Sequence, residues 1–600
     1  MKRKLALLAA VLLVVSLFAG CGGSGTTTPT NAPAPTNAPA PTAAPANPSG
    51  SSEATPAPAP DDGPYQYAAG KYEVDERGVP LEHYAYSLPL TTSDEVFTYW
   101  TGTLVPDQVD PDHYEDGPYP SLLRELTGVN IEYHVIASAS RKENFAALLA
   151  SDDLMDLMIS FKAYYPGTMW NAMEDGYTVN LYDYKDYFPN YMYMLYAHED
   201  DVDYRARLMM DPQTICSFYA LYDQRLPSYG AATRGDWLDK LGIKVDDVVT
   251  MDDFHDLAVA YQSQLGCEHP LVLFQMLDPH RYMSAFDTIA TTSPSGIGVI
   301  APLFVKDGKV QVACTTEGDK NYMTTINSWY NDGIIVPNWN TFDGNNNFMP
   351  DFYEDRIGIT SMLPGESPGY VDNERSPDAY WIALHEPVIY KGQVFHLGDS
   401  ANWIQGFGSW TITTKCENIP MLCTYADWFY SDEGYELSNW GREGTADGCV
   451  FVYNEKGERE LNDFILNNPA GYSWALQEYA YGPMFAAGIL LCYRHYAFPG
   501  GEKLWAFYDI WTDPDYYVYD GSMVFPSALS LPEEDQKYLN TVGTDLNTFV
   551  AENYLLFVDG SRPMSDWDHY VNSVTSLAGW NECMEIWQRN YDEYMAALNA

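Results

Sequence analysis

Residues 232–243, ATRGDWLDKLGI, carry the signals of a short helix and of both its ends. Asp236 is expected to cap the first turn, with Asp239 as its reciprocal partner. Gly242 suits the left-handed conformation that ends a helix, because glycine has no Cβ to clash there. Three apolar residues would share one face of this helix: Trp237, Leu238 and Leu241.

A second capping box follows, in which Thr250 and Asp253 would bond each other's backbone at the start of another helix. The combined pattern is Arg-x-Asp-Trp-Leu-x-x-Leu-Gly, then Thr-x-x-Asp-Phe. It resembles the extracellular solute-binding proteins of family 1. More narrowly, it is similar to their large lipoprotein branch, which serves sugar-importing ABC transporters.

Further stretches carry the same resemblance in order along the chain, which extends it over roughly residues 93–598. They are ELTGV at 125–129, ASDDL at 150–154, NDGI at 331–334 and ADWFYSDEGYELSNWG at 426–441. Asp152 stands where the family has a glycine and Met155 where it has a proline. These two replacements leave open whether the family's tight turn is kept.

Length and charge limit the possible functions. A chain of 600 residues exceeds one ordinary core, so two or more lobes are expected. The net charge of −51 argues against nucleic acid and against anionic membrane surfaces as partners. It also disfavours large polyanionic substrates, unless a local basic pocket overrules the average. Aromatic faces suit sugar rings, but most of the 48 tyrosines and 16 tryptophans are expected to be packing residues.

The N-terminus has the features of a lipoprotein signal peptide at residues 1–21. A basic start precedes an apolar run that ends in LFAGC, with Cys21 in the position that receives a lipid. An ordinary signal peptide with an incidental cysteine is the alternative, but the GGSG that follows Cys21 favours lipidation. Residues 22–70 are expected to form a Pro/Thr/Ala-rich tether. The predicted location is the outer face of the cell membrane, through a lipid anchor.

The alternation of elements predicts an α/β fold. Strands at 96–100, 129–136 and 154–159 with helices between them imply parallel strands, and a hairpin is expected at 303–312. The resemblance implies a two-lobed periplasmic-binding-protein-like (type II) fold with a hinge and chain crossings near residues 218, 360 and 410. The expected lobes are an N-terminal one, 71–218 plus 360–409, and a C-terminal one, 219–359 plus 410–600.

The resemblance implies a binding protein and not an enzyme. It would capture a carbohydrate, with an oligosaccharide as the first expectation, and deliver it to the transmembrane subunits of an ABC permease. A monomer without a cofactor is expected. The alternatives are a surface-anchored glycoside hydrolase, a binding protein for a peptide or other polar solute, and an adhesion or structural lipoprotein. The hydrolase would need two carboxylates at a defined separation, which sequence spacing does not reveal.

Candidate ligand contacts follow from the rule that ligands bind beyond the carboxyl ends of strands in open α/β sheets. Aromatic rings could stack on sugars, and charged groups could bond hydroxyls, although any single aromatic is more often a core residue. Arg234 and Asp236 are secondary candidates. In the first lobe the candidates are Tyr99, Trp100, Lys162, Tyr164 and Tyr165. Near the first crossing they are Tyr219 and Tyr222. In the second lobe they are Trp440 and Arg442, and past the strand near 360 they are Gly365 and Tyr370.

Two other sequence patterns resemble functional motifs, but each also has a structural explanation. Arg234-Gly235-Asp236 is an adhesion triplet, but a helix start is the stronger interpretation. A weak calcium loop is spelled by Asp343, Asn345, Asn347, Asp351 and Glu354, whereas the position that needs glycine holds Phe348. A polar loop is therefore the expected outcome, and no metal site is predicted.

Overall fold

The computed structural model describes most of the chain from Gly63 onward. The described residues are 63–103, 112–198, 202–227, 229–273, 283–289, 303–341, 348–371, 374–397, 402–404, 409–469, 471–481, 487–490, 501–526, 529 and 531–598. Cys21 lies outside them. Among these residues, no helix combines the length and the apolar character that a membrane span requires.

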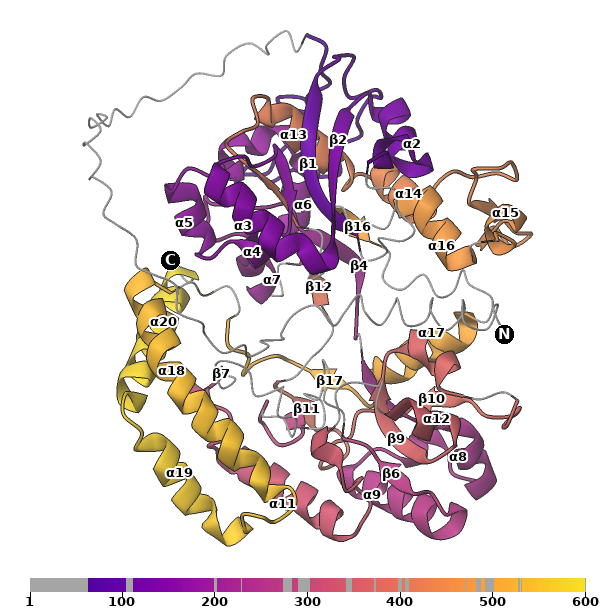
Figure 1. Cartoon of the computed structure of the whole chain (residues 1–600), viewed down its shortest axis with the longest axis vertical. Coiled ribbons are helices and arrows are strands. Elements are labelled where there is room, and N and C mark those ends of the chain that lie inside the picture. Colours follow the sequence, from indigo (N-terminus) through magenta and orange to yellow (C-terminus); the bar gives the residue numbers. More distant parts are fainter. Residues whose placement is uncertain are drawn as a thin grey trace.

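The first lobe is built on a four-stranded sheet in the order β13-β3-β1-β2. Figure 1 shows β1 and β2 of this sheet. β1 pairs in parallel with both β2 and β3, as the alternation of elements predicts, and β13 runs antiparallel to β3. Tyr99 and Trp100 are neighbours in β1 and so point to opposite faces. The strands are β1 Val96–Thr103, β2 Asn130–Ala137, β3 Leu157–Ile159 and β13 Trp410–Ile412.

Helices cover both faces of this sheet. The ring of Trp100 packs against Phe145 of α3, and that of Tyr99 lies near Trp410, which stacks on Tyr425 of α13. The two helices therefore bury opposite faces. The helices of this lobe are α2 Pro118–Thr127, α3 Arg141–Ser151, α4 Phe161–Tyr164, α5 Met169–Glu174, α6 Pro189–Leu195, α7 Val202–Leu208, α13 Ile419–Trp428, α14 Asp432–Trp440, α15 Asp463–Leu466 and α16 Tyr472–Leu476.

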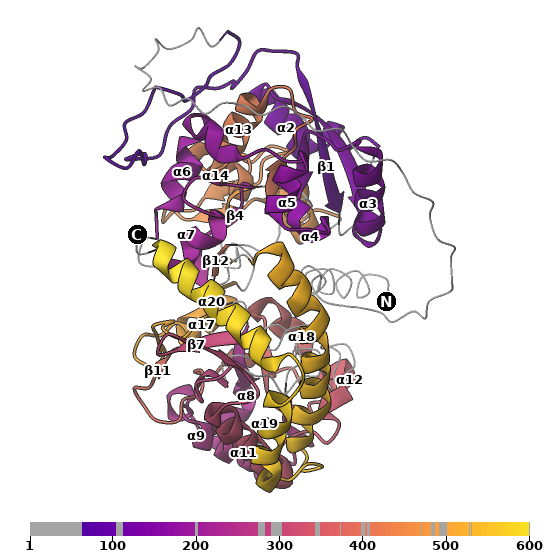
Figure 2. The same cartoon turned by 90° about the vertical axis from the view of Figure 1, so that its left-hand side faces the viewer.

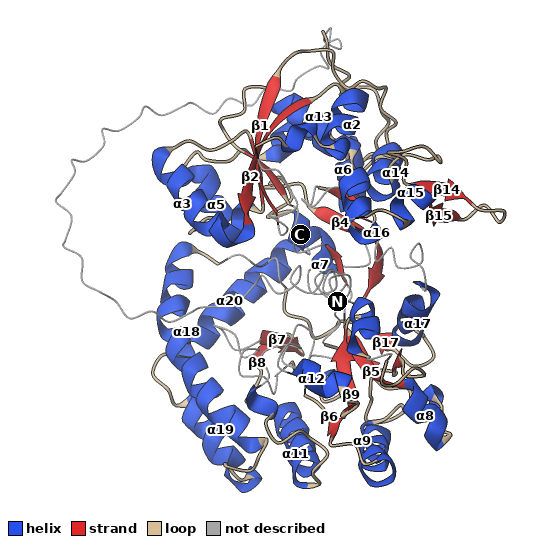
Figure 3. Ribbon diagram, turned by 45° about the vertical axis from the view of Figure 1, so that its right-hand side comes forward, coloured by secondary structure: helices blue, strands red, loops and turns tan. Residues whose placement is uncertain are grey.

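The second lobe has its own core and a sheet in the order β10-β5-β9-β6. Figure 3 shows β5, β9 and β6 of this sheet. The predicted hairpin is present as β7 and β8, and Asp307 and Gly308 turn it with positive φ. The strands are β5 Gly230–Arg234, β6 His269–Leu271, β7 Leu303–Lys306, β8 Lys309–Val312, β9 Ile357–Met362 and β10 Trp381–Ala383. The helices are α8 Gly235–Leu241, α9 Met251–Ala260, α11 Glu317–Asn331, α12 Met349–Tyr353, α17 Gly501–Trp511, α18 Glu533–Tyr554, α19 Trp567–Thr575 and α20 Trp580–Leu598.

Three strands connect the lobes as a small sheet in the order β12-β4-β16. β4 (Ala220–Leu226) leads into the second lobe, β12 (Asn402–Ile404) returns antiparallel to it, and β16 (Gly488–Leu490) runs parallel to β4. In the described chain, β4 and β12 thus pass between the lobes, and β16 lies beside β4. Two smaller strand pairs complete the described sheets: β11 (Val394–Phe395) with β17 (Val518–Tyr519), and β14 (Phe451–Tyr453) with β15 (Arg459–Leu461).

This connectivity corrects the expected lobe boundaries. Residues 360–409 were expected in the first lobe, but β9 pairs with β5 and β6 in the second lobe. Residues from 410 were expected in the second lobe, but β13 pairs with β3 in the first. The expectation failed because β9 is buried along its whole length, so its sequence shows no alternation of polar and apolar residues that would tell which sheet it joins.

Local signals in the sequence had mixed outcomes. Gly242 ends α8 with φ 69°, and the box of Thr250 with Asp253 opens α9 as predicted. Asp236 is not the cap, because α8 already begins at Gly235 and Asp236 lies inside the first turn. Asp152 adopts φ 55° at the end of α3, so the left-handed turn is kept although a glycine is replaced.

The segment between the tether and β1 packs on the first lobe. Tyr65 bridges to Thr91, so the ends of this segment meet, and Ala68 is fully buried. Asn190 of α6 holds its middle: the side-chain oxygen accepts from the Tyr84 amide at 2.6 Å and the side-chain nitrogen donates to the Tyr84 carbonyl at 3.1 Å. The predicted tether boundary at residue 70 is therefore too late, because packed structure already includes Tyr65.

Candidate functional site

Backbone pairing joins three segments of the first lobe that lie far apart in the sequence. The Ser160 amide donates to the Ser409 carbonyl at 2.7 Å. Phe218 and Trp410 exchange two backbone bonds of 2.9 and 2.7 Å. Residues 160–165 after β3, residue 409 before β13 and residues 216–219 before β4 therefore lie side by side. We call these three segments the interlobe edge.

The interlobe edge lies at the carboxyl end of β3 and at the start of the first crossing strand. Ser160 has φ 50°, which turns the chain sharply out of β3 into α4. Figures 1 and 2 place α4 on the side of the first lobe that faces the second lobe. The strand-end rule thus places these candidate residues where the two lobes face each other.

The candidate residues on α4 and just after it differ in their exposure and in their contacts with other side chains. Lys162 is exposed, and among the described residues it makes no ion pair. Tyr164 is half-buried, because its ring packs on Trp100 and Phe145. Tyr165 is half-buried against Phe161 and donates a 2.7 Å bond to Asp175. Lys162 is the candidate of this group with an unengaged charge.

Tyr219 is fixed beside these residues by its own backbone. Its carbonyl accepts from the Tyr430 hydroxyl at 2.5 Å, and its amide donates to the Tyr191 hydroxyl at 3.4 Å. Its hydroxyl lies 3.7 Å from the Cys216 sulfur. Tyr222 follows on β4 and is half-buried. The interlobe edge therefore brings together the segments that carry Lys162 and Tyr219, which the sequence alone did not place side by side.

Two basic residues lie close enough to this edge to act on its titratable groups. Burial raises the pKa of the Cys216 thiol, and the nearby Lys162 ammonium opposes that rise. Burial also raises the pKa of Tyr219, and Arg207 of α7 opposes it. Sequence reasoning missed Arg207; a possible signal was the pair of basic residues in the last turn of that helix.

Four aromatic candidates are packing residues in this structure. Trp100 is fully buried, and its indole donates to the Asn144 oxygen at 2.7 Å. Tyr99 is also buried and accepts from the Trp410 indole at 2.8 Å. They lie within β1 and not at its end, because the strand continues to Thr103. The other two buried aromatics are Tyr370 and Trp440.

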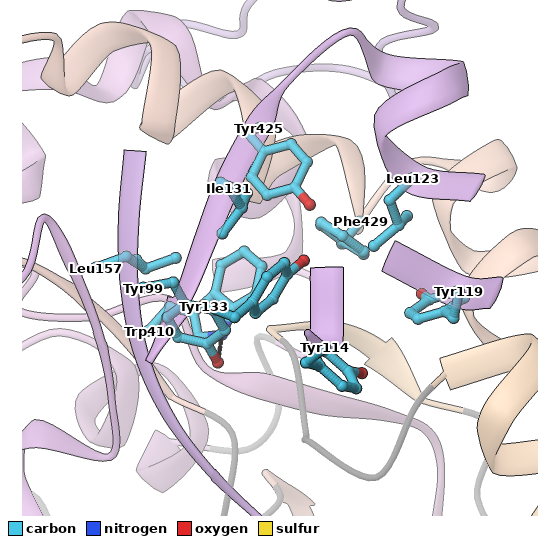
Figure 4. A pocket seen from close by; sticks show the side chains of 10 residues that line it. All are labelled: Tyr99, Tyr114, Tyr119, Leu123, Ile131, Tyr133, Leu157, Trp410, Tyr425 and Phe429. Carbon is cyan, nitrogen blue, oxygen red and sulfur yellow. Dashed lines mark hydrogen bonds between the residues drawn. The ribbon is translucent and has the colours of Figure 1, made fainter. Parts of the chain in front are cut away.

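Tyr99 also lines a small cavity between the sheet and the helices of the first lobe (Figure 4). Tyr133, Tyr425 and Trp410 contribute to its wall. Its volume of about 30 Å³ is the size of one or two water molecules and not of a sugar ring. The cavity is therefore not the candidate ligand site.

Trp440 and Arg442 were expected in the second lobe, and this placement is wrong. The Trp440 ring lies 5.8 Å from that of Phe451, under the Arg459 guanidinium at 5.3 Å. Arg442 pairs with Glu125 of α2 at 3.0 Å. Both residues follow β13, whose pairing with β3 carries this segment into the first lobe.

The remaining second-lobe candidates lie beyond the end of β9. Gly365 and Tyr370 belong to a 3-10 helix at Pro364–Tyr370. Tyr370 stacks on Phe352 with ring centres 4.3 Å apart, and its carbonyl accepts from the Trp381 indole. The ring of Tyr370 is therefore engaged in the core of the second lobe.

Arg234 and Asp236 have a structural role. Arg234 is 2% exposed and donates to Asp236 at 2.8 Å and to Asp355 at 2.5 Å. Its guanidinium lies 4.8 Å from the centre of the Trp237 ring. A buried arginine cannot present an adhesion triplet, so the structure does not favour that alternative.

The structure describes two of the five residues of the weak calcium pattern, Asp351 and Glu354. Asp343, Asn345 and Asn347 lie outside the described residues. Asp351 and Glu354 both pair with the Arg356 guanidinium. In the part of the chain that the structure describes, no group of three or more acidic, histidine or cysteine side chains is arranged to hold a metal ion.

Known structures share this fold over nearly their whole length. The alginate-binding protein AlgQ2, solved without calcium ion, is 19% identical; the match covers 84% of this chain and 99% of AlgQ2, with a TM-score of 0.57. An HMO-binding, ABC-transporter-associated solute-binding protein from Bifidobacterium longum infantis is 14% identical, with 83% and 99% covered and a TM-score of 0.62. The substrate-binding protein FusA of S. pneumoniae, in complex with kestose, is 17% identical, with 84% and 100% covered and a TM-score of 0.55.

Comparisons of the sequence itself found no matching protein-family model and no matching curated protein. The shared property is thus the fold, which persists where sequence identity is low. Together with the crossing strands and the two separate cores, the matches show that this chain has the two-lobed fold of ABC-transporter solute-binding proteins.

Proposed function

We propose that this chain is the substrate-binding component of an ABC importer. It captures a carbohydrate between its lobes and delivers the ligand to a membrane permease. The observation that supports this most strongly is the nearly complete coverage of solute-binding proteins that bind alginate or kestose, both carbohydrates. The family motifs of the sequence agree with it.

The mechanism follows from the connections between the lobes. Each lobe has its own core, and only short strands join them in the described chain. Such strands can act as a hinge, so that the lobes close on a ligand held at the interlobe edge. The proposed ligand is an oligosaccharide, which would contact both lobes at once.

The proposed location is the outer face of the cell membrane. Residues 1–21 carry the lipoprotein signal, and Cys21 would receive the lipid. Residues 22–62 would then link that anchor to the first lobe, where the packed chain begins.

The test is titration calorimetry of the purified protein against a panel of oligosaccharides. Saturable binding at one site per chain, with the sugar recovered unchanged after long incubation, is the expected result. Release of shorter sugars would instead indicate a glycoside hydrolase. Failure of every oligosaccharide, together with binding of peptides, would contradict the carbohydrate assignment.

A further inference from the structure

The two crossing strands pass from one core to the other within a few residues. Figures 1 and 2 place β4 and β12 between the two lobes. On β4, Leu221 is buried in the core of the first lobe, whereas Leu226 packs against the core of the second. On β12, Trp403 packs on the first core, while the preceding Asn402 pairs with Leu226. The passage between the lobes is therefore confined to the residues between Leu221 and Leu226 and to the step before Trp403.

Side-chain contacts narrow the place of this passage on β4. Asp223 accepts a 3.0 Å hydrogen bond from the Tyr435 hydroxyl of α14, which holds it to the first lobe. The Arg225 guanidinium lies 5.3 Å from the centre of the Tyr519 ring of β17, next to the second lobe. Gln224 stands between these two contacts and is the only exposed residue within β4. The strand therefore changes its attachment at Gln224.

The pairing of the crossing strands is irregular at the same level. Asn402 pairs with Leu226 and Ile404 with Leu221. Over this stretch β12 advances by two positions while β4 advances by five, so β4 bulges. A bulge interrupts the ladder and lets the strand bend locally. Gln224 lies within the bulged stretch, so the backbone can turn there without breaking a regular ladder.

An aromatic stack holds β12 to the first lobe directly beside this bend. The ring centres of Trp403 and His198 are 3.5 Å apart, and the ring planes are inclined by only 16°. His198 follows α6, and its ring also meets that of Tyr204 of α7 edge-on at 4.9 Å. The Tyr204 hydroxyl in turn donates to the Met194 carbonyl of α6 at 2.9 Å. The stack therefore ties the crossing strand to the α6–α7 region at the residue that follows the bend.

We propose that the lobes turn about Gln224 and the step before Trp403, and that the stack of Trp403 on His198 limits this turn. The inference rests on the proposed function and adds a control of its ligand site, because the stack sets how far the lobes part before a ligand enters. Contacts on both sides of the bend confine the motion to a few residues, so each lobe moves as a rigid body. Trp403 and His198 are thus positioning residues, which act on the ligand site through the angle between the lobes.

The experiment removes the stack and measures the hinge in the protein without added ligand. In His198→Ala, the radius of gyration from small-angle X-ray scattering should exceed that of the wild type. Less restrained lobes in a chain of net charge −51 favour more separated arrangements. Hydrogen exchange of the amides at 220–226 and 402–404 should be about twofold to tenfold faster, as expected for the loss of one aromatic pair. His198→Phe keeps a ring against Trp403 and should restore both values.

His83→Ala is the matched control. His83 is also a half-buried histidine of the first lobe, and its ring meets that of Tyr193 edge-on at 4.7 Å. It lies in the segment before β1 and not beside a crossing strand. Urea unfolding should show similar losses of stability for His83→Ala and His198→Ala. Only His198→Ala should change the scattering and the exchange of the crossing strands, which separates a hinge role from a general loss of stability.

The place of the bend has its own variant. Gln224→Gly adds backbone freedom at an exposed position, so it should also raise the radius of gyration. An unchanged radius in this variant would overturn the assignment of the bend to Gln224. An unchanged radius in His198→Ala, or an equal change in His83→Ala, would overturn the role of the stack.

These outcomes are distinct from a failure of the proposed function, because no measurement on the variants uses a sugar. Failure of every oligosaccharide in calorimetry contradicts the proposed function alone. Variants that scatter and exchange like the wild type, in a protein that does bind sugar, contradict this inference alone.

Discussion

Asp427 is a fully buried carboxylate that joins three segments of the first lobe. It accepts bonds from the Tyr86 hydroxyl at 2.7 Å, the Tyr191 amide at 2.7 Å and the Asn190 amide at 3.1 Å. Burial outweighs these donors and raises its pKa to about 7. The Asp427 side chain thus connects the N-terminal segment to α6 and α13, although burial disfavours its ionised form.

This raised pKa predicts how stability depends on pH. Between about pH 4 and about pH 7 the folded Asp427 holds a proton that the unfolded chain has already lost. The free energy of unfolding should therefore fall as pH rises through this range, by up to about 4 kcal/mol from this group. Asp427→Asn removes the titration. Urea unfolding at about pH 5 and about pH 8 should show a smaller decline in the variant; parallel profiles would contradict the assignment.

Trp100 is a second buried residue of the first lobe. Its burial predicts that replacing it lowers the stability of the protein and does not specifically abolish ligand binding. Trp100→Ala should lower the free energy of unfolding by about 3–5 kcal/mol, because it leaves a cavity beside Phe145 and Tyr164. Trp100→Phe should cost less, since it keeps most of the volume and loses only the bond to Asn144. A Trp100→Ala protein with unchanged urea unfolding but no sugar binding would show that Trp100 contacts the ligand after all.

At the scale of elements, the end of α3 keeps a left-handed turn although Asp152 stands where the family resemblance has a glycine. Asp152 adopts φ 55°, and its carboxylate pairs with Lys415 at 2.8 Å. Short polar side chains tolerate the left-handed conformation better than other non-glycine residues. The turn is therefore set by the helix end and by the following strand, and not by glycine alone.

The backbone cost of this turn can be measured with two substitutions. Both Asp152→Gly and Asp152→Ala remove the ion pair with Lys415, so their difference reports on the backbone alone. Asp152→Ala should be less stable than Asp152→Gly by about 1 kcal/mol, because alanine meets the full steric penalty at positive φ. Urea unfolding monitored by tryptophan fluorescence provides the comparison. Equal stability of the two variants would mean that the turn relaxes out of the left-handed region.

At the scale of the whole molecule, the crossing strand β4 is tied to both lobes. Asp223 accepts a 3.0 Å bond from the Tyr435 hydroxyl of α14 in the first lobe. Arg225, on the same side of the strand, lies 5.3 Å from the centre of the Tyr519 ring, next to the second lobe. Sequence reasoning missed these residues, because a charged pair on a short strand gives no sign of a hinge.

Hinge motion predicts a change of shape when ligand binds. The radius of gyration in small-angle X-ray scattering should decrease on addition of a saturating oligosaccharide, since closure brings the two cores together. A sugar that fails to bind in calorimetry is the control. An unchanged radius with a sugar that binds would mean that capture does not require closure.

Membrane attachment is a second prediction at this scale. Cys21→Ser should move the protein from the membrane fraction to the soluble or secreted fraction, because the lipid would have no thiol to join. The folded part should keep its affinity for sugar, since Cys21 is separated from the first lobe by the tether. Unchanged membrane fractionation of the variant would contradict the lipid anchor.

The sequence by itself determined the local features of this protein, such as helix ends and turns, and the alternation of strands and helices in its first lobe. Gly242, the Thr250–Asp253 box and the Asp307–Gly308 turn were predictable, because each depends on the conformation of a few adjacent residues. The parallel strands of the first lobe followed from the order of strands and helices. The resemblance in scattered motifs implied the two-lobed fold that the structure displays.

Only the tertiary structure decided which lobe each returning segment joins and which candidates lie together. A buried run such as β9 satisfies either sheet, so its pairing with β5 and β6 was not predictable from hydrophobicity. The same limit affected Trp100 and Trp440, because an aromatic residue looks alike in sequence whether it packs a core or faces a ligand. The segments that carry Lys162 and Tyr219 lie together through backbone bonds with Ser409 and Trp410, and no local pattern in the sequence encodes such contacts between distant segments.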